Sequence, residues 1–344
     1  MILENPYRGQ GLPADAGLAE GEVSADPTQP LALLLRCPAA GATPLRNMAK
    51  LAGEWGCGAL HVKDEGTRMG LGSFKALGAA YAIARDAEGE DLTGKTYVTA
   101  SAGNHGLSVA AGAAAFGADA VIYLSETVPE AFAERLRGHG AQVVRAGAIY
   151  EDSMAAAVAA GEENGWRLLS DTSWPGYTEP ARAIMEGYLA MGVEAADAMP
   201  EPPTHLFLQA GVGGLAAAMA VYARARWGDA PLIAVVEPDR APALQASIKA
   251  GKSVVAPGPV SNMGRLDCKE PSHLALKALA QAADVFITVT DEQAEATVDT
   301  LADHGLATTP SGGAGLAGLQ HGDRAALRLD GGSRVLCFLS EGPE

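Results

Sequence analysis

The sequence predicts an α/β protein with two open, mostly parallel twisted sheets and helices on both faces of each sheet. Three observations lead to this fold class. Short β-branched runs alternate with Ala-rich helical segments through the middle of the chain, which is the pattern of a parallel sheet covered by helices. A proline-rich break at 199–203 separates two such series. A chain of 344 residues is long enough for two domains with a substantial core.

The first series of elements lies before the proline-rich break. Val, Ile, Leu and Tyr cluster in four short runs, which predict strands at 96–99, 120–124, 142–145 and 166–169. Helices are expected between them, over 104–116, from Pro129 onward and over 153–163. Pro129 suits the start of a helix, where its missing N–H is not needed, and Glu130 in the first turn favours the same end.

The second series follows the break and continues to the last strand. Strands are expected at 205–209, 232–237, 285–289 and 334–339, with a helix over 215–226. The stretch 252–271 is rich in Pro, Gly and Ser and has no clear period. We expect it to form a long ordered loop near the functional site.

Composition argues against several kinds of partner. Lys and Arg number 25 against 41 Asp and Glu, a net charge of −16, which disfavours binding to nucleic acid or to an anionic membrane. The four cysteines (Cys37, Cys57, Cys268 and Cys337) are widely spaced and form no CxxC pair. They indicate reduced thiols and no disulfide frame or zinc site. With no signal-peptide pattern and no apolar run of spanning length, we expect a cytoplasmic protein that does not enter a membrane.

Lys75 is the residue that points most directly to chemistry. It follows the glycine-rich stretch 66–72 and lies beside Phe74, where the chain is expected to pass from a loop into a helix. A lysine whose neighbours exclude water can offer a neutral amine to an aldehyde, as Schiff-base chemistry requires. A solvated surface lysine is the alternative, and Lys75 alone does not decide between them.

A glycine-rich turn, Gly211-Val212-Gly213-Gly214-Leu215, lies between an expected strand and an expected helix. Glycine lets the backbone N–H groups approach an anion closely, and the helix N-terminus adds positive potential, so the turn can bind a phosphate. It lacks the P-loop lysine and the GxGxxG spacing of dinucleotide sites. A tight turn without a ligand is the alternative.

Two further turns carry polar side chains. Ser101-Ala102-Gly103-Asn104-His105 follows an expected strand and opens a helix, where hydroxyl, amide and backbone donors suit a carboxylate. The alternative is an ordinary N-cap, with His105 in a structural role. Ser340 follows the last strand, at the edge where open α/β sheets bind ligands, and its hydroxyl can face a heteroaromatic nitrogen. A plain turn serine is the alternative.

In their order along the chain, these motifs resemble those of the fold type II pyridoxal-phosphate enzymes, the tryptophan synthase β/threonine dehydratase superfamily. The likeness extends from Thr43-Pro44-Leu45 to Ser340 and is nearest to the diaminopropionate ammonia-lyases. The segments that carry the nearer match to the diaminopropionate ammonia-lyases include Asn5-Pro6-Tyr7, Arg68-Met69-Gly70-Leu71-Gly72-Ser73-Phe74-Lys75, Asp171-Thr172-Ser173-Trp174-Pro175-Gly176-Tyr177, Ile184-Met185-Glu186-Gly187-Tyr188 and Ser340-Glu341-Gly342.

This resemblance implies the roles of the site residues. Lys75 would attach pyridoxal 5′-phosphate as a Schiff base and then act as a base at the substrate Cα, with Asp171 as a second acid/base. Around the cofactor, Phe74 would pack beside the ring, Asn104 would bind the 3′-oxygen, Gly211, Val212, Gly213, Gly214 and Leu215 would hold the phosphate, and Ser340 would face the pyridine nitrogen. Ser101, Ala102, Gly103, Asn104 and His105 would hold the substrate carboxylate. No metal is implied.

The resemblance also implies an organisation and a reaction. Residues 1–84 and 176–344 would form a large cofactor-binding domain, residues 85–175 a small mobile α/β domain, and two chains a homodimer. The reaction would be α,β-elimination on a small β-substituted amino acid, first of all L-2,3-diaminopropionate, giving pyruvate and ammonia through aminoacrylate. Serine, threonine or hydroxyaspartate dehydration and β-replacement are alternatives. A catalytically silent binding protein is another, and the glycine spacing disfavours a nicotinamide oxidoreductase.

The chain departs from the lyase pattern in two places. Ala102 stands where the lyases have an aspartate thought to serve the D-isomer, and the loop has the form found in threonine and serine dehydratases. Use of a D-substrate is therefore not expected. Arg265, Asp267 and Lys269 replace small residues of the pattern. They would either select a substrate with an additional anionic group or point from a loop into solvent.

Overall fold

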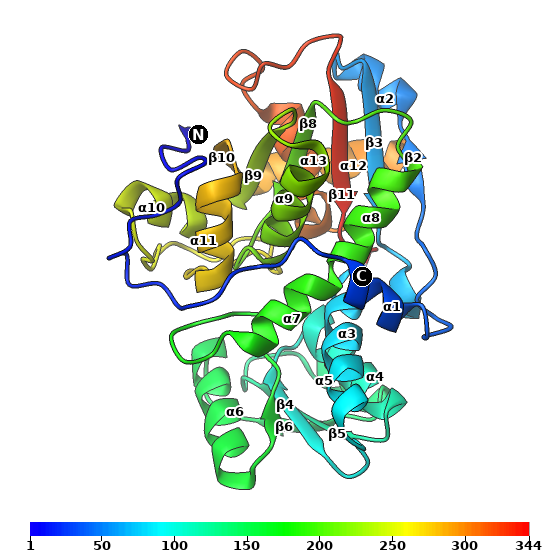
Figure 1. The fold of residues 1–344 in the computed structure, drawn as a ribbon, viewed down its shortest axis with the longest axis vertical. Coiled ribbons are helices and arrows are strands. Elements are labelled where there is room, and N and C mark those ends of the chain that lie inside the picture. The colour runs from blue at the N-terminus through cyan, green and yellow to red at the C-terminus, as the bar shows by residue number, and fades with distance from the viewer. Residues whose placement is uncertain (344) are drawn as a thin grey trace.

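A seven-stranded sheet forms the larger part of the molecule (Figure 1). The computed structural model describes residues 1–343. The spatial order of the strands is β1-β10-β9-β8-β11-β3-β2. Their bounds are β1 (Ile2–Glu4), β2 (Leu45–Asn47), β3 (Ala59–Asp64), β8 (His205–Gln209), β9 (Leu232–Pro238), β10 (Val285–Val289) and β11 (Arg334–Leu339). Strands β10, β9, β8, β11 and β3 are parallel, whereas the edge strands β1 and β2 are antiparallel to their neighbours.

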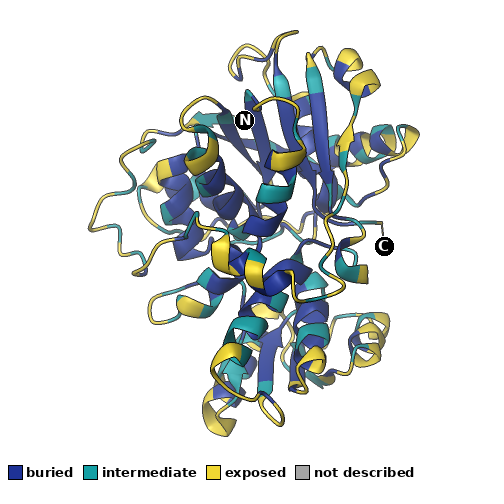
Figure 2. Ribbon diagram, turned by 45° about the vertical axis from the view of Figure 1, so that its right-hand side comes forward, coloured by how far each residue is buried: buried dark blue, intermediate teal, exposed yellow. Residues whose placement is uncertain are grey.

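Both faces of this sheet are covered by helices, and the strand sequences explain why. Side chains alternate between the two faces of a strand. Leu206 and Leu208 pack in one core with α9 (Gly214–Trp227) and α11 (His273–Ala282). Phe207 packs in another with α12 (Asp291–Asp303) and α13 (Pro310–His321). The strands are consequently apolar at successive positions, and Figure 2 shows most of their length as buried.

A second, smaller sheet is parallel throughout, with the order β6-β5-β4-β7. Its strands are β4 (Thr96–Ala100), β5 (Asp119–Leu124), β6 (Gln142–Arg145) and β7 (Arg167–Leu168). Ile122 packs in the core that contains α4 (Asn104–Ala115) and α5 (Glu130–Gly138), whereas the neighbouring Val121 packs with Ala157 of α6 (Tyr150–Asn164). This sheet too is therefore covered on both faces.

Helices α3 (Lys75–Gly89) and α7 (Glu179–Gly187) lie between the two sheets (Figure 1). They pack against each other, α3 also contacts α4 of the smaller sheet, and α7 contacts α9 of the larger one. The remaining helices are α1 (Thr28–Leu34), α2 (Ala49–Glu54), α8 (Leu189–Ala198), α10 (Ala243–Ala250) and the 3-10 helix η1 (Arg68–Gly70). Within residues 1–343, every helix is too short or too polar to cross a bilayer.

The predicted fold class is confirmed. The strands expected at 142–145, 205–209, 285–289 and 334–339 have the bounds found in the structure. The helix expected over 153–163 begins earlier, at Tyr150, because Glu151 and Asp152 in its first turn favour a helix N-terminus. The strand expected at 166–169 is shorter, and the strands β1, β2 and β3 were not anticipated. The stretch 252–271 has neither helix nor strand, as expected.

Candidate active site

Lys75 begins helix α3 beside the segment that follows β11. The loop before it turns sharply, with Met69 and Gly72 at φ values of 52° and 80°, a left-handed conformation that glycine adopts at little cost. The backbone N–H of Phe74 donates a hydrogen bond to the carbonyl of Ser340 at 3.1 Å. The start of α3 is therefore fixed against the end of the large sheet.

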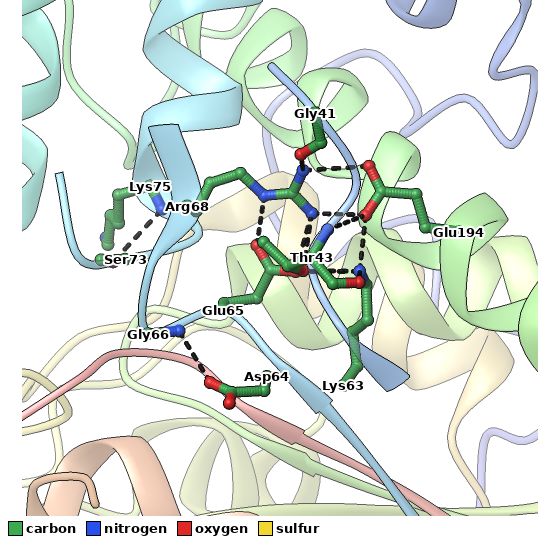
Figure 3. Close-up of polar contacts among 10 residues, drawn as sticks. All are labelled: Gly41, Thr43, Lys63, Asp64, Glu65, Gly66, Arg68, Ser73, Lys75 and Glu194. Carbon is green, nitrogen blue, oxygen red and sulfur yellow. Dashed lines mark hydrogen bonds and ion pairs between the residues drawn. The ribbon is translucent and has the colours of Figure 1, made fainter. Parts of the chain in front are cut away.

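A buried cluster of four charged side chains anchors the beginning of the same loop (Figure 3). Arg68 donates to the Glu65 carboxylate at 2.7 and 2.8 Å and to Glu194 of α8 at 2.6 Å. Lys63 of β3 donates to Glu194 at 2.5 Å and to the Thr43 carbonyl at 2.6 Å. Lys63, Glu65 and Arg68 are fully buried. Because a buried charge left without its partner is costly, the cluster holds β3, the loop and α8 together.

The ammonium group of Lys75 forms an ion pair with the carboxylate of Asp171, which follows β7. Burial alone would raise the pKa of Asp171, but the charge of Lys75 outweighs it and holds that pKa well below its ordinary value. Both side chains keep some exposure, 23% for Lys75 and 16% for Asp171. The pair therefore brings a proton donor and a proton acceptor into contact where a small molecule can reach them.

The ring of His105 lies in the core of the small sheet. Its Nε2 is 2.7 Å from the carbonyl oxygen of Leu169, which can only accept, so Nε2 carries the proton and Nδ1 is an acceptor. Burial lowers the pKa of His105, which keeps the ring neutral. Within the described residues, the buried Nδ1 has no hydrogen-bond partner. The side chain of His105 thus binds backbone of its own sheet, and only its backbone is available to the predicted carboxylate site.

The turn between β4 and α4 contains the residues predicted to bind a carboxylate. Ser101, Ala102, Gly103 and Asn104 are half-buried, and the Gly103 N–H donates to the Ser101 hydroxyl at 3.3 Å. A Cβ at Gly106 would lie 2.2 Å from the Ser101 carbonyl oxygen, so glycine is required there. The first N–H groups of a helix have no intrahelical acceptor, and those of α4 can therefore bind an anion.

The turn 211–215 joins β8 to α9 and has the features that a phosphate requires. Gly213 has a φ of +101°, and a Cβ there would lie 3.1 Å from the side chains of both Ala275 and Leu244. In the described part of the chain, no side chain caps this end of α9 with a hydrogen bond. The uncapped N–H groups and the positive end of the helix fit the phosphate of a cofactor.

An aromatic contact connects Lys75 to this turn. The rings of Phe74 and Tyr188 pack edge to face with their centroids 4.7 Å apart, a favoured geometry for aromatic pairs. The Tyr188 ring also lies 3.7 Å from the position of a Cβ at Gly214. Phe74, the neighbour of Lys75, and the glycine turn therefore both lie against Tyr188, although they are far apart in the sequence.

Glu341 is a site residue that sequence reasoning missed. The side-chain amide of Asn104 donates to its carboxylate, and Glu341 directly follows the predicted site residue Ser340. Both Ser340 and Glu341 are only 6% exposed. One feature of the sequence could have indicated Glu341: it is an acidic residue next to a serine predicted to face the cofactor ring, at the carboxyl end of a central strand.

Arg265, Asp267 and Lys269 lie in the loop 252–271, where the lyase pattern has small residues, and their surroundings differ. Lys269 donates to Asp267 at 2.5 Å and to two backbone carbonyls at 3.0 Å, so these two side chains stabilise the loop itself. The Nε of Arg265 lies 3.7 Å from the Glu341 carboxylate and 3.4 Å from the position of a Cβ at Gly103. Of the two cations, only Arg265 lies at the candidate site.

A lysine at a helix start, an acid in contact with it and a turn that fits a phosphate are together consistent with an enzyme that carries pyridoxal phosphate on a lysine. The chain belongs to the family of pyridoxal-phosphate dependent enzymes, whose model matches residues 37–341. Pyridoxal phosphate is therefore its cofactor.

Two relatives and one solved structure describe the position of the chain within this family. The diaminopropionate ammonia-lyase of Salmonella typhimurium is 34% identical over 289 residues, which cover 76% of this chain and 72% of the relative. The biosynthetic L-threonine dehydratase of Escherichia coli is 30% identical over 314 residues, covering 90% of this chain and 58% of that protein. The crystal structure of the Escherichia coli diaminopropionate ammonia lyase in complex with an aminoacrylate-PLP azomethine reaction intermediate has a TM-score of 0.89 and 28% identity, covering 99% of this chain and 93% of that chain.

Proposed function

We propose that this chain is an ammonia-lyase that eliminates the β-amino group of 2,3-diaminopropionate and prefers the L-isomer. The observation that carries the proposal is the contact between Lys75 and Asp171, because elimination needs a base at Cα and an acid near the leaving group. The similarity to a protein and a structure named diaminopropionate ammonia-lyase supports the choice of substrate. The overall reaction consumes one water and yields one pyruvate and two ammonia.

The residues around Lys75 would hold the cofactor. Bound pyridoxal phosphate withdraws electrons from the substrate Cα, which acidifies the Cα proton and allows a β-substituent to leave. The groups that would bind it are the amine of Lys75, the ring of Phe74, the amide of Asn104, the turn formed by Gly211, Val212, Gly213, Gly214 and Leu215, and the hydroxyl of Ser340. A neutral hydroxyl at Ser340 leaves the ring nitrogen largely unprotonated, which favours elimination over transamination.

Lys75 and Asp171 would divide the proton transfers. We assign removal of the Cα proton to the amine of Lys75 and protonation of the leaving amine to Asp171. The ion pair lowers the pKa of Asp171 against the effect of burial. When the positive charge on Lys75 is lost, burial remains and favours the protonated acid. Asp171 would thereby gain the ability to hold a proton and give it to the leaving amine.

The turn between β4 and α4 would hold the substrate carboxylate with the hydroxyl of Ser101, the backbone of Ala102, Gly103 and His105, and Asn104. This turn belongs to the smaller sheet, whereas the glycine turn 211–215 belongs to the larger one. We assign residues 85–175 to a small domain that closes on the large domain of residues 1–84 and 176–344. Closure would bring the substrate to Lys75 and exclude water.

A dehydratase acting on serine or threonine is the second candidate. Ala102 gives the carboxylate turn the form typical of dehydratases, and the threonine dehydratase of Escherichia coli is 30% identical to the chain. We expect Asp171 to favour the lyase, since it contacts Lys75 and would give a proton to the leaving amine.

A substrate screen distinguishes these candidates. Pyruvate or 2-oxobutyrate release by the holoenzyme is measured with L- and D-2,3-diaminopropionate, L-serine, L-threonine and 3-hydroxyaspartate. The proposal expects the highest kcat/KM for L-2,3-diaminopropionate. A higher value for serine, threonine or hydroxyaspartate would establish the dehydratase. Binding of amino acids without turnover of any of them would identify a silent binding protein.

A further inference from the structure

The carboxylate of Glu341 lies buried between two donors from different parts of the fold. One oxygen, Oε2, accepts a hydrogen bond from Nδ2 of Asn104, at the start of helix α4, which packs on the smaller sheet. The other, Oε1, accepts from the hydroxyl of Thr309, which precedes α13 on the larger sheet. The geometry points to Glu341 as a positioning residue that fixes the orientation of the Asn104 amide.

A side-chain amide presents donors at nitrogen and an acceptor at oxygen, whereas a carboxylate only accepts. Facing Glu341, Asn104 must therefore present Nδ2. A half-turn of the amide would bring Oδ1 against the carboxylate and leave two acceptors facing each other, which is costly in a buried site. Within residues 1–343, Nδ2 donates to Glu341 alone. The second Nδ2–H of Asn104 thus remains available to another acceptor.

Glu341 is itself held on several sides, so it can act as a fixed reference. The hydroxyl of Thr308 donates to its backbone carbonyl at 2.6 Å. Thr309 also caps α13 by accepting from the N–H of Gly312 at 3.0 Å, which ties its hydroxyl to the helix. Arg265 lies 3.7 Å from the same carboxylate. A rigid acceptor transmits its position to Asn104 more faithfully than a mobile one.

The consequence rests on the proposed role of Asn104 as donor to the 3′-oxygen of the cofactor. A donor at that oxygen favours the tautomer of the cofactor imine in which the proton lies on nitrogen and the oxygen is anionic. Without Glu341 the amide can turn and present Oδ1 to the cofactor, which favours the tautomer with a protonated ring oxygen. Glu341 therefore acts on the cofactor through Asn104 and need not touch it.

A double-mutant cycle tests this inference through the absorption spectrum of the bound cofactor. Four holoenzymes are compared: wild type, Asn104→Ala, Glu341→Met and the double variant. We expect Asn104→Ala and Glu341→Met to shift intensity from the visible to the near-ultraviolet band by similar amounts. In the Asn104→Ala background, Glu341→Met should produce no further shift.

Two more variants separate positioning from stability. Thr297→Val removes two hydrogen bonds of α12, to the Gln293 carbonyl and to the Gln320 amide oxygen, that do not involve Glu341, so it should lower the melting temperature and leave the spectrum unchanged. If Glu341→Met does not fold, Glu341→Gln takes its place. A glutamine can present either oxygen or nitrogen to Asn104, and its spectrum should lie between those of wild type and Asn104→Ala.

Failure of the inference about Glu341 and failure of the proposed role of Asn104 give different spectra. A spectral shift with Asn104→Ala but none with Glu341→Met or Glu341→Gln would overturn the inference and leave the proposed function intact. Additive shifts in the cycle would overturn it too, because Glu341 would then act on the cofactor by its own charge. An unchanged spectrum with Asn104→Ala would remove the role of Asn104 at the cofactor and, with it, the inference.

Discussion

Lys75 and Asp171 are in contact although 96 positions separate them in the chain. Lys75 begins the helix that lies between the two sheets, and Asp171 follows the edge strand β7 of the smaller sheet. The pair exists only when the smaller sheet is assembled against α3. The proposed acid and base thus come from different parts of the fold, and their separation would respond to any movement between those parts.

The first prediction concerns the acid of this pair. Asp171→Asn should lower kcat for L-2,3-diaminopropionate by about 10²–10⁴, the range typical of one positioned proton-transfer group. The holoenzyme should keep its cofactor, since the phosphate turn and Lys75 are unchanged. Asp119→Asn is the matched control, because Asp119 is an exposed acid of the same sheet. An unchanged kcat in Asp171→Asn would remove it from the mechanism.

The ion pair also predicts a pH dependence of stability in the cofactor-free protein. In the wild type the pKa of Asp171 is lowered, so its contribution to stability is present above the unfolded-state pKa of about 3.9 and is lost as the pH falls through the folded value. In Lys75→Ala burial acts without the compensating charge and raises the pKa. Asp171 then contributes stability at low pH that is lost as the pH rises.

The free energies of unfolding of the two cofactor-free proteins should therefore diverge as the pH rises above about 3.9, the unfolded-state pKa of an aspartate, with Lys75→Ala becoming relatively less stable. Urea titrations at several pH values measure this difference. The double variant Lys75→Ala/Asp171→Asn serves as the control and should lose the divergence. A difference that stays constant with pH would show that the two groups are not coupled.

The glycine turn predicts separate effects on cofactor binding and stability. Gly213→Ala adds a Cβ at a φ of +101°, 3.1 Å from Ala275 and Leu244, so the turn must shift and its N–H groups move away from the phosphate. Gly228→Ala imposes a similar strain at the other end of α9, at a φ of +60° with nothing within 4 Å. Both variants should lose about 1 kcal/mol or more of stability.

Only Gly213→Ala should also release cofactor on dialysis, which we expect to appear as a dissociation constant raised at least about tenfold, equivalent to about 1.4 kcal/mol. Absorbance of the dialysed protein gives the retained fraction. Equal retention by the two variants would mean that the turn does not bind the phosphate.

Ala102 predicts the stereochemical preference. An alanine cannot accept the Cα proton of a D-substrate, whereas Lys75 and Asp171 remain available for the L-isomer. We expect kcat/KM for L-2,3-diaminopropionate to exceed that for the D-isomer by about 10²–10⁴. Ala102→Asp should raise turnover of the D-isomer more than that of the L-isomer. Similar values for both enantiomers in the wild type would indicate another base on the second face.

Local sequence was enough to predict the fold class and the turns between strands and helices that contain candidate site residues. The sequence predicts turns between a strand and a helix at 211–215 and at 101–105. Such turns follow the carboxyl ends of parallel strands. The contacts of Lys63 were not predictable in this way. It stands in a strand as an apparently ordinary charged residue, yet it is fully buried against Glu194, 131 positions further along the chain.

The same limitation explains why Glu341 was missed. Its partners Asn104 and Thr309 are 237 and 32 positions away, and only the packing of the two sheets brings them together. Sequence patterns encode periodicity and turns within one element. They do not encode which side chains of separate elements meet, and the buried polar contacts of Lys63 and of Glu341 both depend on such meetings.

The stoichiometry of the products tests the central claim most directly. Diaminopropionate is the only substrate of the panel that carries two nitrogen atoms. The β-nitrogen leaves in the elimination, and the α-nitrogen is released when aminoacrylate hydrolyses to pyruvate. Holoenzyme incubated with L-2,3-diaminopropionate should yield ammonia and pyruvate in a ratio of about two to one, with Lys75→Ala inactive. Absence of pyruvate with this substrate, or equal activity in Lys75→Ala, would contradict the assignment of the protein as a lysine-dependent diaminopropionate ammonia-lyase.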